Sequence, residues 1–339
     1  MKQYEEAKQI SQIVANAKTI VILQADNPDA DSLASALALE QILHKLGKNP
    51  HMYCGVDMPE YLRYLSGWDR VVKDLPPKFD ASVIVDTSSI KLFEKLVDGG
   101  MRGWLSAKPC VVLDHHAVTG DTIDFAHAYV NDTESSSTGE VIYNLSRQLD
   151  WPLDKTSAAN IMTAILGDTQ GLTNDLARAA TYRIMAELVE LGVDRPKIEE
   201  LRREYGKMDL AIYKYKAKLI ERTEFTAENR IAVVSIPHAE IKEYSPLYNP
   251  APLVQNDMLQ TRGVGIAIVF KQYDGGRITA AIRSNSDYPF AANLAEYFGG
   301  GGHPHASGFK ILGGKTLADI KKECIAKATE LVNQSENKT

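Results

Sequence analysis

Residues 111–116 have the sequence Val-Val-Leu-Asp-His-His, an aliphatic run that ends abruptly in a carboxylate and two imidazoles. The run follows Pro109, and β-branched residues bounded by a proline are typical of a short buried strand. The polar triplet then lies at the carboxyl end of that strand, which is where open α/β sheets bind their ligands. We therefore expect a site at one edge of a mostly parallel sheet.

Other apolar segments end in acids in the same way. Two are strand-like runs at 20–23 and 82–85, and one is a helix expected at 157–166; the acids that follow them are Asp26, Asp29, Asp31, Asp86 and Asp168. Carboxylates and imidazoles that converge at one edge of a sheet repel one another, or are costly to bury, unless a cation neutralises them. The pattern therefore predicts a divalent metal site, most simply a pair of ions.

Alternation of strands and helices predicts the fold class. Strand-like runs up to residue 113 alternate with amphipathic helical segments, which indicates a mostly parallel, doubly wound α/β sheet with helices on both faces. A segment rich in Lys, Arg and Glu at 195–225 reads as a solvated helix, and strand-like runs with a hairpin signal at 274–276 follow it. We expect a metal-binding domain at 1–190, a helical connector at 191–227 and a smaller α/β domain at 228–335.

Charge and cysteine content restrict the class of protein. The formal net charge is −6 for 339 residues, which argues against a protein that coats long duplex nucleic acid. Cys54, Cys110 and Cys324 are far apart, so they predict buried free thiols rather than a disulfide framework. The charged N-terminus does not resemble a signal peptide, and no apolar run has membrane-spanning length. We expect a cytoplasmic protein without a membrane partner.

The ordered set of acids, the Asp-His-His triplet and Asp168 together resemble the DHH phosphoesterase superfamily. The similarity extends into the C-terminal region. Residues 298–309 contain a glycine run followed by His303 and resemble the GGGH signature of the DHHA1 domain, and Arg283-Ser284 resembles the Arg-Ser strand of that domain. The resemblance covers nearly the whole chain, in the same domain order as in stand-alone bacterial enzymes of this superfamily. It implies a DHH domain followed by a DHHA1 domain.

The resemblance also implies a role for each matching residue of the first domain. Asp29 would bind the first of two metal ions, Asp86 would bridge both, and the second ion would be completed by Asp31, His115 and Asp168. Mn²⁺ is the expected metal, with Mg²⁺ or Co²⁺ as alternatives.

The remaining two members of the triplet are expected to act beside the metals. Asp114 would hold His115 in place, and His116 would face the scissile phosphate, so that His116, Asp114 and Asp86 form the expected catalytic group.

The resemblance implies hydrolysis of a small nucleotide: a short oligoribonucleotide, 3′-phosphoadenosine 5′-phosphate or cyclic di-AMP. The second domain would bind this substrate through Arg283, Ser284, Gly300, Gly301, Gly302 and His303. Successive glycines let backbone amides approach an anion and form a nest, although a bare glycine run is more often a flexible turn. Likewise, the polar loop at 131–140 either caps a helix through Ser137 and Glu140 or forms a hydroxyl-rich wall near an anion.

One residue departs from the family pattern. The family usually has a histidine three residues before the proline of the first acidic motif, and here that position is Ala25. The first metal site therefore lacks an imidazole, although Asp26 could supply an oxygen. The alternatives are an enzyme with a labile first metal and a catalytically weak nucleotide-binding or regulatory protein. A third alternative is an inorganic pyrophosphatase, and the GGGH motif argues against it. The oligomeric state stays open, with a homodimer as one alternative.

Overall fold

A computed structural model describes residues 2–117, 122–244 and 249–336 of the chain, which divides into two compact units, Met1–Lys207 and Met208–Thr339. The division falls within 191–227, the range predicted as a connector. Helix α8 (Arg195–Tyr205) belongs to the first unit and helix α9 (Leu210–Glu221) to the second.

The sheet of the first unit is parallel throughout, with strand order β2-β1-β3-β4-β5. The strands are β1 (Thr19–Gln24), β2 (Asn49–Cys54), β3 (Ala81–Val85), β4 (Cys110–Asp114) and β5 (Ala128–Asn131). Apart from Thr19, the residues of the central strands β1, β3 and β4 are buried, and most are apolar, as expected where helices cover both sides of a sheet. The predicted doubly wound α/β class is therefore confirmed.

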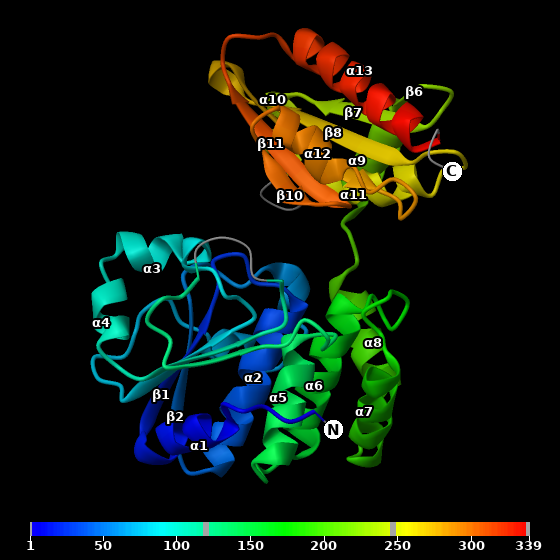
Figure 1. The fold of residues 1–339 in the computed structure, drawn as a ribbon. Coiled ribbons are helices and arrows are strands. Elements are labelled where there is room, and N and C mark those ends of the chain that lie inside the picture. Colours follow the sequence, from blue (N-terminus) through cyan, green and yellow to red (C-terminus); the bar gives the residue numbers. More distant parts are fainter. Residues whose placement is uncertain (1, 118–121, 245–248, 337–339) are drawn as a thin grey trace. The chain divides into compact units, whose positions relative to one another are not determined.

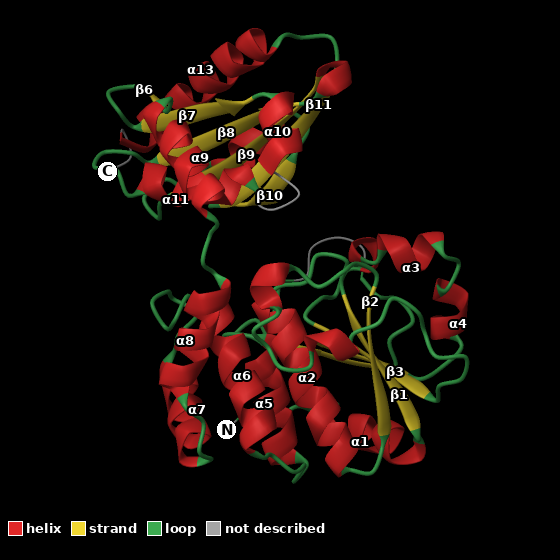
Figure 2. Ribbon diagram, turned by 180° about the vertical axis from the view of Figure 1, so that it is seen from behind, coloured by secondary structure: helices red, strands yellow, loops and turns green. Residues whose placement is uncertain are grey.

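Two layers of helices cover this sheet (Figures 1 and 2). Ile20 and Ile22 of β1 face the larger layer, and Val21 and Leu23 face the smaller one, because successive side chains of a strand alternate between faces. The larger layer contains α1 (Ala7–Asn16), α2 (Ala30–Lys45), α5 (Thr138–Gln148), α6 (Lys155–Asp168) and α7 (Ala179–Glu190). The smaller layer contains α3 (Glu94–Asp98) and α4 (Arg102–Ser106).

Two glycines let α2, α5 and α6 approach one another closely. A Cβ atom on Gly139 of α5 would lie 2.4 Å from the Cβ of Ala164 in α6. A Cβ on Gly167 of α6 would lie 2.9 Å from the Cβ of Ala30, the first residue of α2. Both contacts are shorter than packed carbon atoms allow, so only glycine fits. This close packing brings the ends of the three helices together at the carboxyl edge of the sheet.

The second unit contains a mixed sheet with strand order β10-β11-β9-β8-β7-β6, in which only the β7–β8 pair is parallel among the described strands. The strands are β6 (Glu224–Thr226), β7 (Ile231–Ile236), β8 (Ile266–Gln272), β9 (Arg277–Ser284), β10 (Gly301–His303) and β11 (Ala306–Leu312). The predicted hairpin joins β8 and β9 through a short turn at Asp274–Gly276.

Helices α12 (Ala291–Tyr297) and α13 (Leu317–Glu336) pack on one face of this sheet, and α9, α10 (His238–Tyr244) and α11 (Pro250–Leu259) pack over β7 and β8 on the other. The prediction of one solvated helix at 195–225 is wrong. The segment forms α8 and α9, and α9 buries Ile212, Tyr215 and Leu219 in the core of the second unit.

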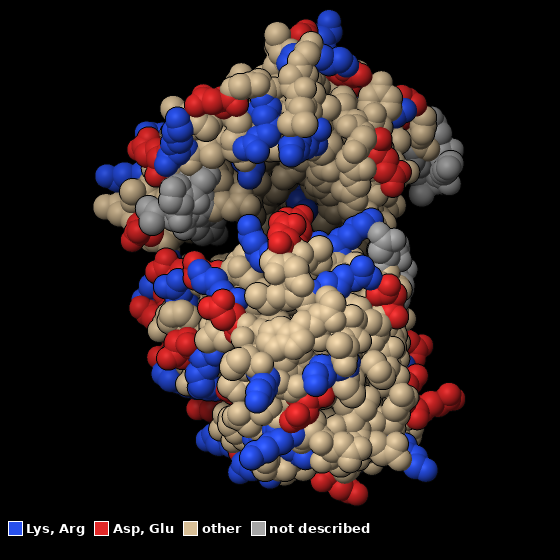
Figure 3. Space-filling view, turned by 90° about the vertical axis from the view of Figure 1, so that its left-hand side faces the viewer, with Lys and Arg blue, Asp and Glu red and all other residues tan. Residues whose placement is uncertain are grey.

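In the part of the chain that the structure describes, no helix is both long and apolar enough to cross a bilayer. On the face of the first unit drawn in Figure 3, basic and acidic side chains are interspersed rather than separated by sign.

The close helix packing predicts a specific loss of stability. Gly139→Ala should lower the free energy of unfolding by about 1–3 kcal/mol, because the added methyl group forces α5 away from α6. Urea unfolding followed by circular dichroism measures this change. Gly103→Ala is the matched control, since it also lies in a helix and a Cβ atom there would meet nothing within 4 Å. Equal stability of the two variants would contradict the packing argument.

Candidate metal centre

Asp31 is a fully buried carboxylate at the start of α2 and lies against the N-terminus of α5. Its Oδ2 accepts a hydrogen bond from the amide of Thr138 (2.6 Å), and its Oδ1 accepts from the amide of Gly139 (3.2 Å) and from the Ser35 hydroxyl (2.8 Å). The first amides of a helix have no partner within the helix and carry partial positive charge. Asp31 therefore caps α5 while it faces the other acids.

Asp86 directly follows β3 and has the left-handed backbone conformation, with φ of 63°. This conformation is uncommon for residues other than glycine, and aspartate tolerates it better than most. The carboxylate is buried, and its Oδ1 accepts a hydrogen bond from the Thr138 hydroxyl at 3.0 Å. Thr138 thus contacts Asp31 through its amide and Asp86 through its side chain.

Successive side chains of the Asp-His-His triplet at the end of β4 point to opposite sides of the chain. The side chain of Asp114 accepts from the His116 ring Nδ1 at 2.9 Å, from the Ser88 hydroxyl, and from the backbone amides of both histidines. Asp114 therefore contacts His115 through its backbone amide and orients the ring of His116. Residues i and i+2 of an extended chain share a face, so Asp114 reaches His116 rather than its neighbour.

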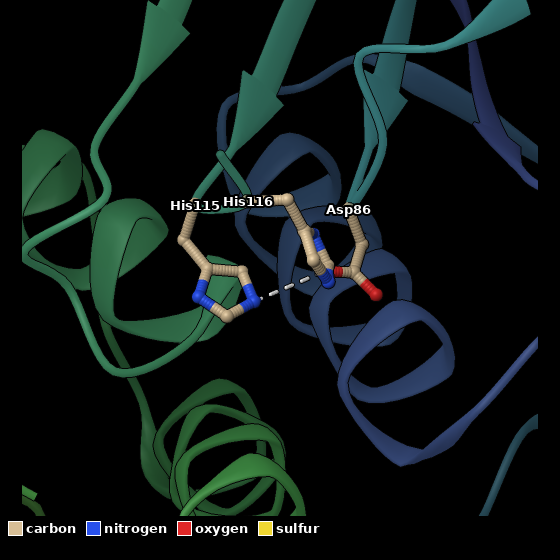
Figure 4. A group of neighbouring side chains, drawn as sticks. All are labelled: Asp86, His115 and His116. Carbon is tan, nitrogen blue, oxygen red and sulfur yellow. Dashed lines mark ion pairs between the residues drawn. The ribbon is translucent and has the colours of Figure 1, made fainter. Parts of the chain in front are cut away.

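The ring of His115 points into the cluster of acids. Its Nε2 lies 2.9 Å from Asp168 Oδ2, 3.5 Å from Asp31 Oδ2 and 3.6 Å from Asp86 Oδ1. Figure 4 shows His115, His116 and Asp86 converging from the ends of β4 and β3. Asp168 is the last residue of α6, so strands and helices both contribute to the cluster.

These groups fit a metal ion. The Nε2 atom of His115 is buried and has no aligned hydrogen-bond partner, although three carboxylates surround it. Among the described residues, two groups have donor atoms within 4.8 Å of one another: Asp31, His115 and Asp168, and Asp86, His115 and His116. A buried imidazole lone pair facing carboxylate oxygens is the donor set of a borderline divalent cation. The two groups share His115 and therefore lie side by side.

In the metal-free protein, the close approach of these buried groups shifts their pKa values. Burial, with the nearby charges of Asp168 and Asp29, raises the pKa of Asp31 to about 6. Burial and the charge of Asp31 raise the pKa of Asp86 well above its usual value. Burial alone would lower the pKa of His115, but Asp168 and Asp31 raise it to about 9. A bound metal would therefore compete with protons for these groups.

The predicted first metal site is less complete. Asp29 is exposed and serves as the N-cap of α2, accepting from the Ser32 amide at 3.0 Å. Asp26 accepts from the Lys95 amide at 2.8 Å, and its carboxylate lies against Gly55. Neither acid belongs to the converging groups found among the described residues. Asp26 therefore does not replace the imidazole that Ala25 lacks.

Sequence reasoning missed the hydroxyl groups that hold the acids. Thr138, Ser35 and Ser88 each donate to a buried carboxylate. The Ser137 side chain caps α5 through the Glu140 amide, as predicted, while the Glu140 side chain accepts from Ser136 instead of completing the capping box. The capping spacing located the start of α5 but did not reveal that this start contacts Asp31 and Asp86.

The second unit places the predicted substrate-binding residues on β9 and the β10–β11 hairpin. Arg283 is exposed at the end of β9, and Ser284 is buried with its hydroxyl 3.3 Å from the Pro304 carbonyl oxygen. His303 pairs with Ala306, which pairs with Arg283, so these three residues form one row across the sheet. The structure therefore brings Arg283 and His303 to the same face.

The glycine run has a structural role that the nest interpretation did not include. The amides of Gly299 and Gly300 donate to the end of α12, and Gly301 and Gly302 pair with β11. A Cβ on Gly300 would lie 2.2 Å from the Gly308 carbonyl oxygen. Gly302 has φ of 142°, and a Cβ there would lie 2.6 Å from backbone atoms of Ala306 and Ser307. Close backbone packing alone therefore accounts for glycine at 300 and 302.

Comparison with known proteins finds one matching family model and several similar proteins. A family model described as the DHH family, N-terminal domain, matches residues 19–166. The bifunctional oligoribonuclease and PAP phosphatase NrnA of Bacillus subtilis (strain 168) is 25% identical over 315 residues, which cover 90% of this chain and 95% of that protein.

Solved structures show the same fold. An exopolyphosphatase-related protein from Bacteroides fragilis matches with a TM-score of 0.82 and 21% identity, covering 96% of this chain and 95% of that one. RecJ from Thermus thermophilus, solved in complex with Mn²⁺, matches with a TM-score of 0.53 and 15% identity, covering 97% of this chain and 54% of that one.

The fold, the cluster of acids and imidazoles and these relatives define a metal-dependent phosphoester hydrolase. The match over residues 19–166 agrees with the resemblance to the DHH family that the sequence motifs indicated.

The raised pKa values predict how metal and pH act on stability. The raised pKa of Asp31 stabilises the metal-free protein fully below pH 3.8, and this stabilisation is lost as the pH rises through about 6. The contribution of His115 is complete below pH 6.5 and is lost as the pH rises through about 9. Mg²⁺ replaces these protons, so the rise in Tm that saturating Mg²⁺ produces should be larger near pH 9 than near pH 6.5.

Differential scanning calorimetry of chelated and Mg²⁺-loaded protein measures this difference. His115→Gln should abolish the pH dependence of the Mg²⁺ effect, whereas His44→Gln, at an exposed histidine of α2, should leave it unchanged. A metal effect that does not vary with pH would show that the protons and the metal do not compete for this cluster.

Proposed function

We propose that the chain hydrolyses phosphoester bonds in short nucleotide substrates, such as oligoribonucleotides or 3′-phosphoadenosine 5′-phosphate, by a two-metal mechanism. The observation that carries the proposal is the His115 imidazole, which is buried, has no aligned partner and is surrounded by the carboxylates of Asp31, Asp86 and Asp168. The oligoribonuclease and PAP phosphatase activities for which NrnA is named support the substrate class. Arg283 and His303 on one face of the second unit supply cationic and donor groups for such a substrate.

The residues would divide the work between metal binding and hydrogen bonding to the substrate. Asp31, His115 and Asp168 would hold one ion, and Asp86 would bridge to a second ion that Asp29 also contacts. Bound divalent ions would supply Lewis acidity to the phosphate and to the attacking water. The Asp114 carboxylate fixes His116 through Nδ1, which leaves Nε2 to hydrogen-bond a phosphate oxygen or the leaving group. The hydrogen bond to Asp114 raises the pKa of His116, which favours the form that donates from both nitrogens.

Mn²⁺ is the metal we propose, supported by the mixed imidazole and carboxylate donors and by the Mn²⁺ in the RecJ neighbour. The direct test is hydrolysis of a panel of oligoribonucleotides, 3′-phosphoadenosine 5′-phosphate and cyclic di-AMP, with Mn²⁺, Mg²⁺ or Co²⁺ added after chelation. The alanine at position 25 favours a second candidate function, a nucleotide-binding protein with the same fold. Tight binding of the panel without turnover under any metal would support that candidate.

The bridging role predicts the effect of one isosteric change. Asp86→Asn should abolish turnover, because an amide oxygen lacks the charge to hold two cations. The loss should greatly exceed the tenfold that about 1.4 kcal/mol of barrier would produce. Steady-state kinetics with Mn²⁺ gives the rate, and a Tm close to that of the wild type shows that the fold is intact. Asp26→Asn is the matched control and should retain turnover, since its carboxylate faces Lys95.

The missing imidazole predicts unequal metal affinities. Calorimetric titration of the chelated protein with Mn²⁺ should give a tighter site, held by Asp31, His115 and Asp168, and a weaker one that activity follows. Ala25→His should tighten the weaker site and lower the Mn²⁺ concentration needed for half-maximal rate, whereas Ala25→Leu should not. Binding of a single ion by the wild type at saturating Mn²⁺, without hydrolysis of the panel, would contradict the proposal.

A further inference from the structure

One face of the sheet in the second unit is partly open over β9 and β11. Residues of β9 alternate strictly: Ile278, Ala280 and Ile282 are buried toward α12 and α13, and the residues between them lie on the opposite face. Helix α11 covers that opposite face over β7 and β8 and reaches β9 at Ala281. Arg277 and Arg283, at the two ends of β9, are exposed.

Cross-strand register orders the side chains of this open face into rows. Arg283, Ala306 and His303 form the row already proposed to bind substrate. Four residues earlier in β9, Thr279 pairs with Lys271 on one side and with Lys310 on the other. Directly opposed residues in antiparallel strands point to the same side of a sheet, so both lysines lie on the same face as Arg283. Lys310 is exposed there, and Lys271 is partly buried beside the N-terminus of α11.

A further cation continues the series beyond the two lysines. The guanidinium of Arg277 lies 3.8 Å from the ring centroid of Tyr273, at the hairpin that joins β8 and β9. A positively charged track with an aromatic side chain beside it is the usual composition of surfaces that bind single-stranded nucleic acid.

None of these cations has a carboxylate partner among the described residues. Lys271 donates to the neutral Asn249 side chain at 3.0 Å, and ion pairs are found for neither lysine nor for Arg277 and Arg283. By contrast, lysines on α13 of the same unit are paired, Lys321 with Glu224 and Lys327 with Glu330. Unpaired like charges on one face repel one another, and a polyanionic ligand would remove that repulsion.

The surface between the Arg283 row and the row of two lysines has room for an oligonucleotide. The intervening row consists of Ala281, Gly308 and Gly301, which carry almost no side chain, and a Cβ atom on Gly301 would meet nothing within 4 Å. Four residues of β-strand place the Arg283 row roughly 13 Å from the lysine row. A stacked strand carries a phosphate about every 3.4 Å, so that distance corresponds to roughly four nucleotides and exceeds the length of a stacked dinucleotide.

We propose that the row of Lys271, Thr279 and Lys310 is a second phosphate-binding subsite, which grips single-stranded oligoribonucleotides that extend beyond the Arg283 row. The identity of the ligand rests on the proposed function. The subsite adds to that function a preference for substrate length. A dinucleotide or 3′-phosphoadenosine 5′-phosphate bound at Arg283 does not reach the lysines. The chain therefore binds longer members of its substrate class more tightly, through contacts made only by their distal phosphates.

The test measures binding without turnover. Metal-chelated protein is titrated with a fluorescein-labelled pentaribonucleotide by fluorescence anisotropy, and unlabelled pentaribonucleotide and diribonucleotide compete. Lys271→Gln/Lys310→Gln should weaken the pentaribonucleotide about tenfold and leave the diribonucleotide within about twofold. The slope of log affinity against log salt should fall by about 1.4, because each phosphate contact on a single strand contributes about 0.7.

Lys214→Gln/Lys322→Gln is the matched control, which removes the same charge from α9 and α13 and should change neither ligand. Lys310→Gln alone, at an exposed side chain, should lower the slope by about 0.7 and serves if the double variant is unstable. Equal weakening of both ligands, an equal effect of the control, or no binding of the pentaribonucleotide by the wild type would overturn the subsite. Hydrolysis of the panel is measured separately, so failure of the subsite and failure of the proposed activity give different results.

Discussion

The buried carboxylate of Asp31 is the group on which the first unit depends most. It accepts hydrogen bonds from two amides at the start of α5 and from Ser35 of its own helix, and it faces His115 across the cluster. Burying a carboxylate costs several kcal/mol unless such partners replace its water. The amides can do so only because α5 approaches α6 at Gly139 and α6 approaches α2 at Gly167. The close spacing of these helices and the burial of the Asp31 charge therefore depend on each other.

The same constraint makes the two candidate metal positions unlike each other. Asp31 and Asp168 lie at the ends of helices that the core holds in place, and His115 follows the buried strand β4. At the other position, Asp29 is exposed and engaged in capping α2, and Ala25 offers no donor atom. His116 is oriented by Asp114 and by the loop that contains Ser88, independently of the helices. The proposed pair of ions would therefore be asymmetric, with one ion firmly held and the other exchangeable.

Much of this arrangement was readable from the sequence, because each acid follows an apolar run whose end falls at the same edge of the sheet. Three features were not readable, for physical reasons. The partner of Asp114 depends on which face each residue takes after β4 ends. The contact from Thr138 to Asp86 joins elements 52 residues apart and requires the helix packing itself. The buried stripe of Ile212, Tyr215 and Leu219 in α9 was hidden because charged residues surround it.

The backbone of the β10–β11 hairpin leads to a conclusion about descent. Gly300 and Gly302 are required because any side chain would collide with β11, and Gly308 is required because it lies against the Ala280 carbonyl oxygen. A lineage that lost all catalytic activity would still retain these glycines for as long as the unit folded. The presence of the glycine run is therefore evidence of common descent. The exposed Arg283 and His303 can be substituted once selection for ligand binding is relaxed.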